Sequence, residues 1–212
     1  MSRTKTTEAR TLGRPREFDI DEALDKAMVL FWEKGYDGTS LAELAATMGI
    51  TKPSLYAAFT DKQTLFEAAL TRYADGPYSF AVRAHSLPTA REVVKALLDG
   101  TVNVSTCATG PRGCLYTQAT MAHDGEIRDA AAANTRKGER MLEARFRKAQ
   151  QNGELPQHVD CAALARFVTT VALGITIRGV MGSSRGELKL VVDEAMQAWP
   201  TAEQAVHKRK KR

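Results

Sequence analysis

The chain has 212 residues, of which 43% are hydrophobic and 26% are charged, a balance typical of a soluble globular protein. This composition excludes a wholly disordered chain and a disulfide-rich mini-protein. No uninterrupted apolar stretch reaches the roughly 18 residues of a membrane helix, and no apolar block near the N-terminus marks a secretory signal. We therefore expect no membrane partner and a cytoplasmic location.

The net charge of +5 comes from one end of the chain. The last five residues, 208–212, are all Lys or Arg, whereas residues 1–207 hold 25 basic and 25 acidic residues. We expect the basic tail, residues 205–212, to be a solvated end, although such a tail can also hold nucleic acid weakly. Net charge by itself gives no reason to expect DNA binding.

Apolar residues recur at helical spacing along most of the chain, without the strand-like alternation that precedes hairpin turns. Ser, Thr or Asp stands before most of these segments, and Gly or Pro ends several of them. We predict an all-α fold with about nine helices. The predicted helices cover approximately residues 19–35, 40–49, 51–59, 60–75, 89–106, 114–122, 124–152, 160–180 and 184–199.

Two short predicted helices meet at Gly49 and form a candidate helix-turn-helix unit. The close crossing of the helices requires a small residue, which Ala45 supplies. The turn requires a left-handed residue, and Gly49 adopts that conformation without a Cβ penalty. Leu55, six residues after the glycine, is placed to fill the crossing from the second helix. An ordinary αα-corner is the alternative structural interpretation.

The residues around this turn resemble the DNA-binding domain of the TetR/AcrR family of regulators. The resemblance rests on Thr39–Ala45, Met48–Tyr56 and Phe59–Lys62 followed by Leu65, and it covers residues 16–75. The rest of the chain matches the family only as an all-helical region of suitable length. The resemblance implies a homodimer, palindromic double-stranded operator DNA and a small-molecule effector bound in a C-terminal cavity.

The second helix of the unit is expected to place its N-terminal residues near base edges in the major groove. Lys52 and Ser54 can hydrogen-bond bases or phosphates, whereas Pro53 can make only apolar contact. Ser40 and Lys62 lie near helix starts, where free N–H groups assist phosphate binding. The predicted DNA-binding residues are Arg14, Arg16, Ser40, Thr51, Lys52, Pro53, Ser54, Tyr56 and Lys62.

Base readout by this helix is expected to be modest. The helix has no Arg, Asn or Gln, the side chains that read guanine or adenine through two hydrogen bonds. DNA shape and phosphate contacts are therefore expected to carry more of the affinity. Tyr56 follows the predicted buried Leu55 and is expected to face outward, where family members use this residue on the DNA backbone; a partly buried aromatic is the alternative.

The N-terminal arm, residues 1–17, offers a second DNA contact. Its segment Gly13-Arg14-Pro15-Arg16 resembles the Gly-Arg-Pro core of minor-groove hooks. Arg14 would gain from the enhanced negative potential of a narrow, A/T-rich minor groove. An unbound flexible leader is the alternative.

We predict that residues 18–66 form the helix-turn-helix domain and that residues 67–204 form a ligand-binding and dimerisation domain. The last two predicted helices are rich in apolar residues, so two from each of two chains would form a four-helix bundle. Packing of these helices within one chain is the alternative. The predicted dimer-interface residues are Phe167, Val171, Ile175, Leu188, Val192, Met196 and Trp199.

The family resemblance implies a cavity between the middle helices, and an apolar cavity with a few polar groups suits a small, largely apolar ligand. Each candidate lining residue could instead belong to the plain core. The candidates are Leu98, Tyr116, Met121, His123, Phe146 and Phe167, with Tyr78, Phe80 and Leu97 as further choices.

Cys107 and Cys114 flank a Gly-Pro break, and buried structural cysteines are their plain interpretation. The alternative is a redox or electrophile sensor, because Arg112 and a helix start could lower the thiol pKa of Cys114. The cysteines and histidines show no metal-ligand spacing, and motifs for nucleotide binding or hydrolysis are missing. We therefore predict no metal, no cofactor and no enzymatic activity.

The leading hypothesis is a homodimeric transcriptional repressor that a small molecule releases from its operator. A redox-sensing or electrophile-sensing regulator that uses Cys107 or Cys114 is one alternative. A helical small-molecule-binding protein without DNA binding is the alternative from another class. An enzyme without recognised motifs has no positive support in the sequence.

Overall fold

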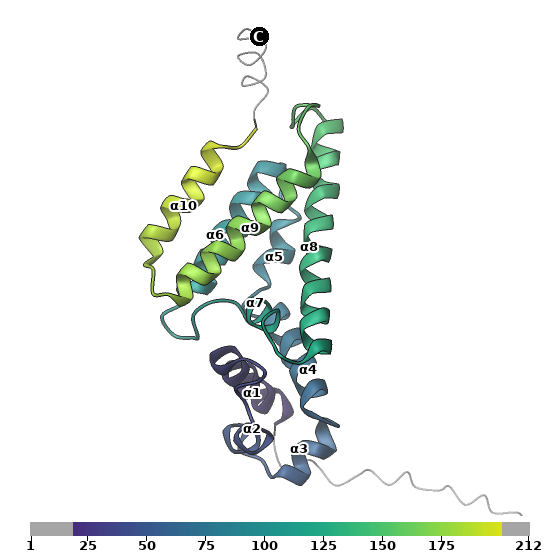
Figure 1. The fold of residues 1–212 in the computed structure, drawn as a ribbon, viewed down its shortest axis with the longest axis vertical. Coiled ribbons are helices and arrows are strands. Elements are labelled where there is room, and N and C mark those ends of the chain that lie inside the picture. The colour runs from purple at the N-terminus through teal and green to yellow at the C-terminus, as the bar shows by residue number, and fades with distance from the viewer. Residues whose placement is uncertain (1–18, 201–212) are drawn as a thin grey trace, which may run out of the picture.

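The computed structural model describes residues 19–200, and this part of the chain folds into ten α-helices without a strand. The all-α prediction is confirmed. Helices α1 (Ile20–Lys34), α2 (Leu41–Met48) and α3 (Lys52–Ala58) lie at one end of the molecule, and α4 (Lys62–Asp75) leads from them toward the other helices (Figure 1). The predictions for Arg14, Arg16 and the basic tail lie outside the described residues.

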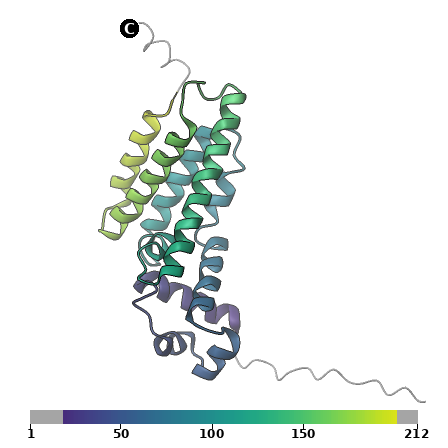
Figure 2. The same cartoon turned by 45° about the vertical axis from the view of Figure 1, so that its right-hand side comes forward.

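The remaining helices build the larger part of the molecule. They are α5 (Phe80–Ala84), α6 (Ala90–Ser105), α7 (Leu115–Ala119), α8 (Gly125–Gln151), α9 (Cys161–Val180) and α10 (Arg185–Gln197). Helix α9 packs against α6, α8 and α10. Helix α8 runs along one side of this bundle, and α7 lies between the bundle and the helices of the N-terminal end (Figures 1 and 2).

All nine predicted helices are present, and α5 is the additional one. It has only five residues, and its N-cap Ser79 makes no side-chain cap hydrogen bond, so it leaves no periodic apolar signal in the sequence. Helix α5 packs against α6. The Phe80 ring lies so close to Gly100 that a Cβ at position 100 would come within 2.0 Å of it.

Local capping explains where most of the helices begin. Thr89 and Ser184 form complete capping boxes with Glu92 and Glu187, in which each partner bonds the backbone of the other. Ser40 and Glu43 have the sequence spacing of a capping box, but only half of the box forms. Ser40 accepts a hydrogen bond from the Glu43 amide, but the Glu43 carboxylate pairs with a Lys34 ammonium instead.

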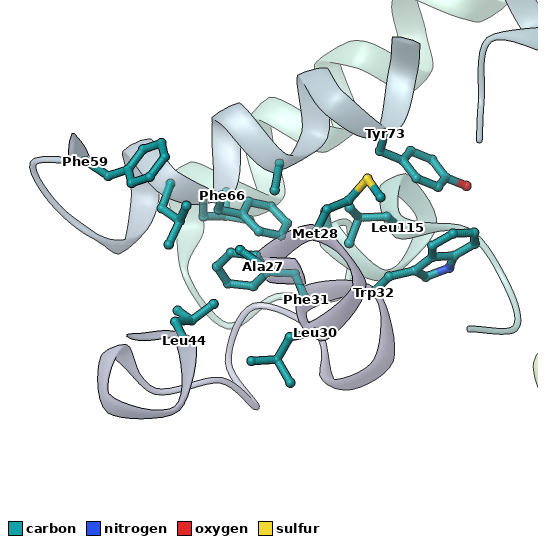
Figure 3. Packing of buried hydrophobic residues seen from close by; sticks show 14 of the residues in the cluster. Ala27, Met28, Leu30, Phe31, Trp32, Leu44, Phe59, Phe66, Tyr73 and Leu115 are labelled. Atoms are coloured by element: carbon teal, nitrogen blue, oxygen red, sulfur yellow. The ribbon is translucent and has the colours of Figure 1, made fainter. Parts of the chain in front are cut away.

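Two groups of buried side chains hold the fold together. The first joins α1–α4 with α7 and the start of α8, and in it the Phe31 and Phe66 rings meet edge to face with centroids 4.9 Å apart (Figure 3). The second lies among α6, α8, α9 and α10. Helix α4 is continuous across residues 66 and 67, so the domain boundary there, which stays a prediction, falls inside a helix.

Helix α9 is long and apolar enough, judged by length and composition alone, to cross a membrane. Arg166 and Arg178 interrupt its apolar residues, so no uninterrupted stretch of this length stands in the sequence. In the fold, α9 contacts three neighbouring helices and contributes Ala165, Val168 and Ile175 to the second core. In this fold α9 is therefore packed among other helices of a bundle. A helix in such a position can be as apolar as a membrane-spanning helix.

Candidate nucleic-acid interface and ligand cavity

The turn between α2 and α3 has the geometry that the sequence pattern predicts. Gly49 adopts φ 73° and ψ 29°, and the amides of Gly49 and Ile50 bond the last carbonyls of α2. No atom outside its immediate chain neighbours lies within 4 Å of the place that a Cβ at position 49 would occupy, so the left-handed backbone alone favours glycine there. Ala45 and Leu55 are buried at the crossing. The two helices therefore form a helix-turn-helix.

The N-terminal end of α3 presents short polar and apolar side chains. Thr51 is the N-cap: its hydroxyl accepts a hydrogen bond from the Ser54 amide and lies 2.9 Å from the Ser54 hydroxyl. Lys52 and Pro53 occupy the first turn and are exposed, whereas Ser54 is half-buried. Lys52 is consequently the one cation that α3 itself presents to solvent.

Tyr56 extends this exposed surface by one turn. Its side chain is 50% exposed, whereas the preceding Leu55 is 1% exposed. The outer face of α3, which we define as Lys52, Pro53, Tyr56 and Ala57, is therefore not covered by the rest of the chain. An uncovered short helix at one end of the molecule is placed so that it can enter a DNA groove.

Lys62 has partners that the sequence analysis did not foresee. Its ammonium lies 4.2 Å from the centroid of the Tyr36 ring, an attractive cation–π contact. Partial burial lowers the pKa of Lys62, while the nearby Asp37 carboxylate opposes that shift. A phosphate contact by Lys62 stays a prediction and would compete with the Tyr36 ring. Tyr36 and Asp37 lie in a turn without periodic pattern, so no sequence signal identified them.

A cavity of about 480 Å³ lies above the first core, bounded by α4–α9. Of the residues proposed for it from the sequence, Tyr116, Tyr78, Phe80 and Leu97 line its wall. Several other lining residues were not predicted, because helical periodicity alone does not say which side of a helix faces a cavity. They include Tyr73, Thr101, Ser105, Cys114, Thr117 and Thr176.

Five of the residues proposed as ligand contacts lie elsewhere. Leu98 and Phe146 are buried in the second core, because they point between helices rather than toward the cavity. Met121 is exposed, and the imidazole of His123 is turned to the Asp37 carboxylate, 3.1 Å away. Phe167 lies on the outer side of α9.

The predicted dimer residues also separate into two groups. Five of them are buried within the single chain, because α9 and α10 cover one another and α6. These are Ile175, Leu188, Val192, Met196 and Trp199. Phe167 is exposed and Val171 is half-buried. Their neighbours Ile177, Met181 and Leu190 are exposed and apolar, and the sequence analysis did not select them.

The cysteine geometry lacks the feature on which the sensor alternative rested. The Arg112 guanidinium donates hydrogen bonds to the carbonyls of Gly179 and Ser183, so its charge is committed to the end of α9. Cys114 is a buried N-cap residue of the five-residue helix α7. The pKa of Cys107 is lowered by hydrogen bonding to Thr109. The sensor alternative is therefore not favoured, because Arg112 is engaged elsewhere and the one lowered thiol pKa, that of Cys107, comes from local hydrogen bonds.

The left-handed turn at Gly49, the buried crossing of Ala45 with Leu55 and the uncovered helix α3 define a helix-turn-helix DNA-binding protein. Comparison with known families agrees along most of the chain. Residues 23–69 match the model for bacterial regulatory proteins of the tetR family, and residues 90–195 match the tetracyclin repressor-like C-terminal domain. The chain belongs to the TetR family of bacterial transcriptional regulators.

Individual relatives extend this similarity over nearly the full length. The chain is 37% identical to the HTH-type transcriptional repressor ComR of Escherichia coli strain K12 over 196 residues, which cover 89% of this chain and 92% of ComR. It is 30% identical to the repressor BdcR of the same strain, covering 85% and 89%. A cysteine-substituted TetR family regulator CifR, solved with 26-base-pair operator DNA, superposes with a TM-score of 0.82 at 39% identity, covering 89% of this chain and 100% of CifR.

Proposed function

We propose that the protein is a homodimeric transcriptional repressor that binds a palindromic operator and is released from it by a small, largely apolar molecule. The observation that carries this proposal is the uncovered outer face of α3 beside a helix-turn-helix turn. The relatives ComR and BdcR are named as repressors, and the CifR structure contains operator DNA, which supports the same function here. The proposal requires no catalysis, and the protein would act in the compartment that holds the DNA.

The DNA contact would be made by the first turns of α3 and by the helix starts around it. Lys52 would meet phosphate or a base edge, Pro53 a thymine methyl group, and Tyr56 the DNA backbone. The free backbone N–H groups at the N-termini of α2 and α4, next to Ser40 and Lys62, would assist phosphate binding. Arg14 and Arg16 of the arm would add a minor-groove contact.

Dimerisation would use the exposed apolar side of α9 and α10. Phe167 and Ile177 are exposed on α9, Met181 is exposed at its C-cap, and Leu190 and Val191 are exposed on α10. Contiguous exposed apolar surface of this kind marks protein interfaces. A two-fold axis there would hold two α3 helices about one DNA turn apart, roughly 34–36 Å.

Release would follow from the position of the cavity relative to α4. This helix begins with Lys62 at the DNA-binding end and carries Tyr73 into the cavity wall one helix length away. A ligand that fits the cavity better in one orientation of α4 would favour that orientation and change the separation of the two α3 helices. Binding of ligand and binding of operator would then oppose each other.

The test measures operator binding by the full-length protein. Fluorescence anisotropy reports the binding of labelled DNA from upstream of its own gene. Lys52→Ala and Tyr56→Ala should weaken binding, and Lys52→Ala should reduce the slope of log K against log salt by about 1. Lys148→Ala, an exposed charge at the far end of α8, is the matched control and should bind like the wild type. Unaltered affinity in both α3 variants would refute the proposed surface.

A further inference from the structure

Two buried hydroxyl groups in the cavity wall lack hydrogen-bond partners. Tyr73 and Ser105 are each 0% exposed, and among residues 19–200 nothing pairs with the Tyr73 Oη or the Ser105 Oγ. Buried polar groups in folded proteins are nearly always hydrogen-bonded, so each exception calls for an explanation. Both residues line the cavity, and their oxygens are covered by neighbouring side chains, so a bound molecule would become their partner by displacing that cover.

Several other hydroxyls of the same cavity already have hydrogen-bond partners. Thr101 donates to the Leu97 carbonyl at 2.8 Å, and Thr176 donates to the Ala172 carbonyl at 3.0 Å, each within its own helix. Such bonds hold the hydroxyl against the backbone and turn the methyl group to the cavity. Tyr73 and Ser105 are the two fully buried hydroxyls of the wall with an unused donor and acceptor, and within the described part of the chain the hydroxyls of Tyr78 and Thr117 make no side-chain hydrogen bond either.

The Tyr73 ring is held firmly while its hydroxyl stays unpaired. Its centroid lies 4.9 Å from that of Trp32 and 5.6 Å from that of Tyr116, both edge to face. The Cys114 thiol and the Leu115 backbone lie close to the Tyr73 hydroxyl, but neither reaches the distance and angle of a hydrogen bond with it. Burial raises the pKa of Tyr73, so the phenol stays protonated. In Figure 3 the Tyr73 hydroxyl points away from Phe66 and Leu115, and the Tyr73 ring lies beside Trp32.

The charge of the wall limits what can bind. The described residues that form it include no Asp, Glu or Arg, so a cationic ligand would find no counter-charge. Lys137 is exposed at the wall, and burial together with the nearby Arg145 lowers the pKa of His85, which favours its neutral form. Tyr78, Phe80 and Tyr116 supply flat apolar surface for a ring.

We propose that the effector is an uncharged molecule with an apolar, ring-containing body and one hydroxyl or carbonyl oxygen, which the Tyr73 hydroxyl binds, with Ser105 as the second polar contact. This inference rests on the proposed ligand-released repressor and adds the chemical class of its ligand. Either a hydroxyl or a carbonyl group on the ligand suits this contact, because the Tyr73 hydroxyl can both donate and accept a hydrogen bond.

The test compares three probes of similar size: 4-propylphenol, 4-methylacetophenone and propylbenzene. Isothermal titration of the full-length wild type should give the two oxygen-containing probes several-fold tighter binding than the hydrocarbon. Tyr73→Phe keeps the ring and removes the hydroxyl, so it should weaken binding of both oxygen-containing probes about threefold to tenfold, the effect of one neutral hydrogen bond. Propylbenzene binding should not change.

Two further variants sharpen the result. Ser105→Ala should reduce the same preference by a smaller factor, and Thr101→Val, which removes a satisfied hydroxyl from the same wall, should leave it unchanged. The proposed class is overturned if propylbenzene binds the wild type as tightly as the phenol, if Tyr73→Phe keeps the preference, or if no probe binds. Operator binding, measured on the same preparations, separates these outcomes from failure of the repressor function itself.

Discussion

The Gln118 side chain donates a hydrogen bond from Nε2 to the backbone carbonyl of Trp32, 2.7 Å away. Trp32 lies in the last turn of α1, whose final carbonyls have no partner within the helix. Gln118 belongs to α7, the helix that also places Tyr116 and Thr117 in the cavity wall. One short helix thus contacts both the cavity and the C-terminal end of the first helix of the DNA-binding domain.

Removing this bond should loosen α1 from α7. Gln118→Ala would leave the Trp32 carbonyl unpaired in a largely buried place, which costs about 1–3 kcal/mol of unfolding free energy. Urea denaturation measures this loss. We also expect operator release by 4-propylphenol to require more probe in this variant, because movement of α7 would no longer pass directly to α1.

Gln63→Ala is a suitable control for stability, since its bond to Glu67 lies on the solvent side of α4 and contributes only a few tenths of a kcal/mol. If Gln118→Ala has the unfolding free energy of the wild type and releases the operator at the same probe concentration, the bond does not couple α7 to α1.

The left-handed backbone at Gly49 should make this position intolerant of side chains. Gly49→Ala is expected to lower the unfolding free energy by about 1–2 kcal/mol through backbone strain alone, because the added Cβ meets open space. Gly138→Ala is the matched control: position 138 is also open, but it lies inside α8 and has no positive φ. Helix propensity predicts about 0.5–1 kcal/mol of stabilisation there. Equal thermal shifts for the two variants would contradict this account.

Arg14 lies in the arm outside the described residues, and its role is predicted from the sequence. Arg14→Ala should weaken operator binding and flatten its dependence on salt, because one cation would no longer displace counterions from the minor groove. A salt titration of operator affinity measures both effects. If affinity matches the wild type at every salt concentration, the arm has no part in binding.

The exposed apolar side of α9 and α10 should control assembly. Ile177→Lys and Leu190→Lys would each place an unpaired ammonium in the proposed interface, so the dimer dissociation constant should rise at least tenfold. Analytical ultracentrifugation measures this constant. Val29→Lys makes a comparable change on α1, outside the proposed interface, and should leave the dimer intact. A wild type that is monomeric at all concentrations, or lysine variants that stay dimeric, would place the interface elsewhere.

Most of the DNA-binding end was readable from the sequence because its determinants are local. Thr51 caps the backbone three residues away, and Gly49 terminates the helix that precedes it. Leu55 and Tyr56 are neighbours, so burial of one turns the other outward. Interactions of this range depend on a few consecutive residues, whatever the rest of the chain does.

The C-terminal region was predicted as helices but not as surfaces. Leu97 and Leu98 are adjacent and alike, yet the first lines the cavity and the second is buried in the core. Ile175 and Ile177 are both apolar residues of α9, but only Ile175 is covered by the chain's own helices. Apolar periodicity identifies a helix that must be buried, but the rotation and packing partners of that helix decide which face meets the core, the cavity or solvent. Only the tertiary structure contains that information, because it arises from contacts between segments far apart in the sequence.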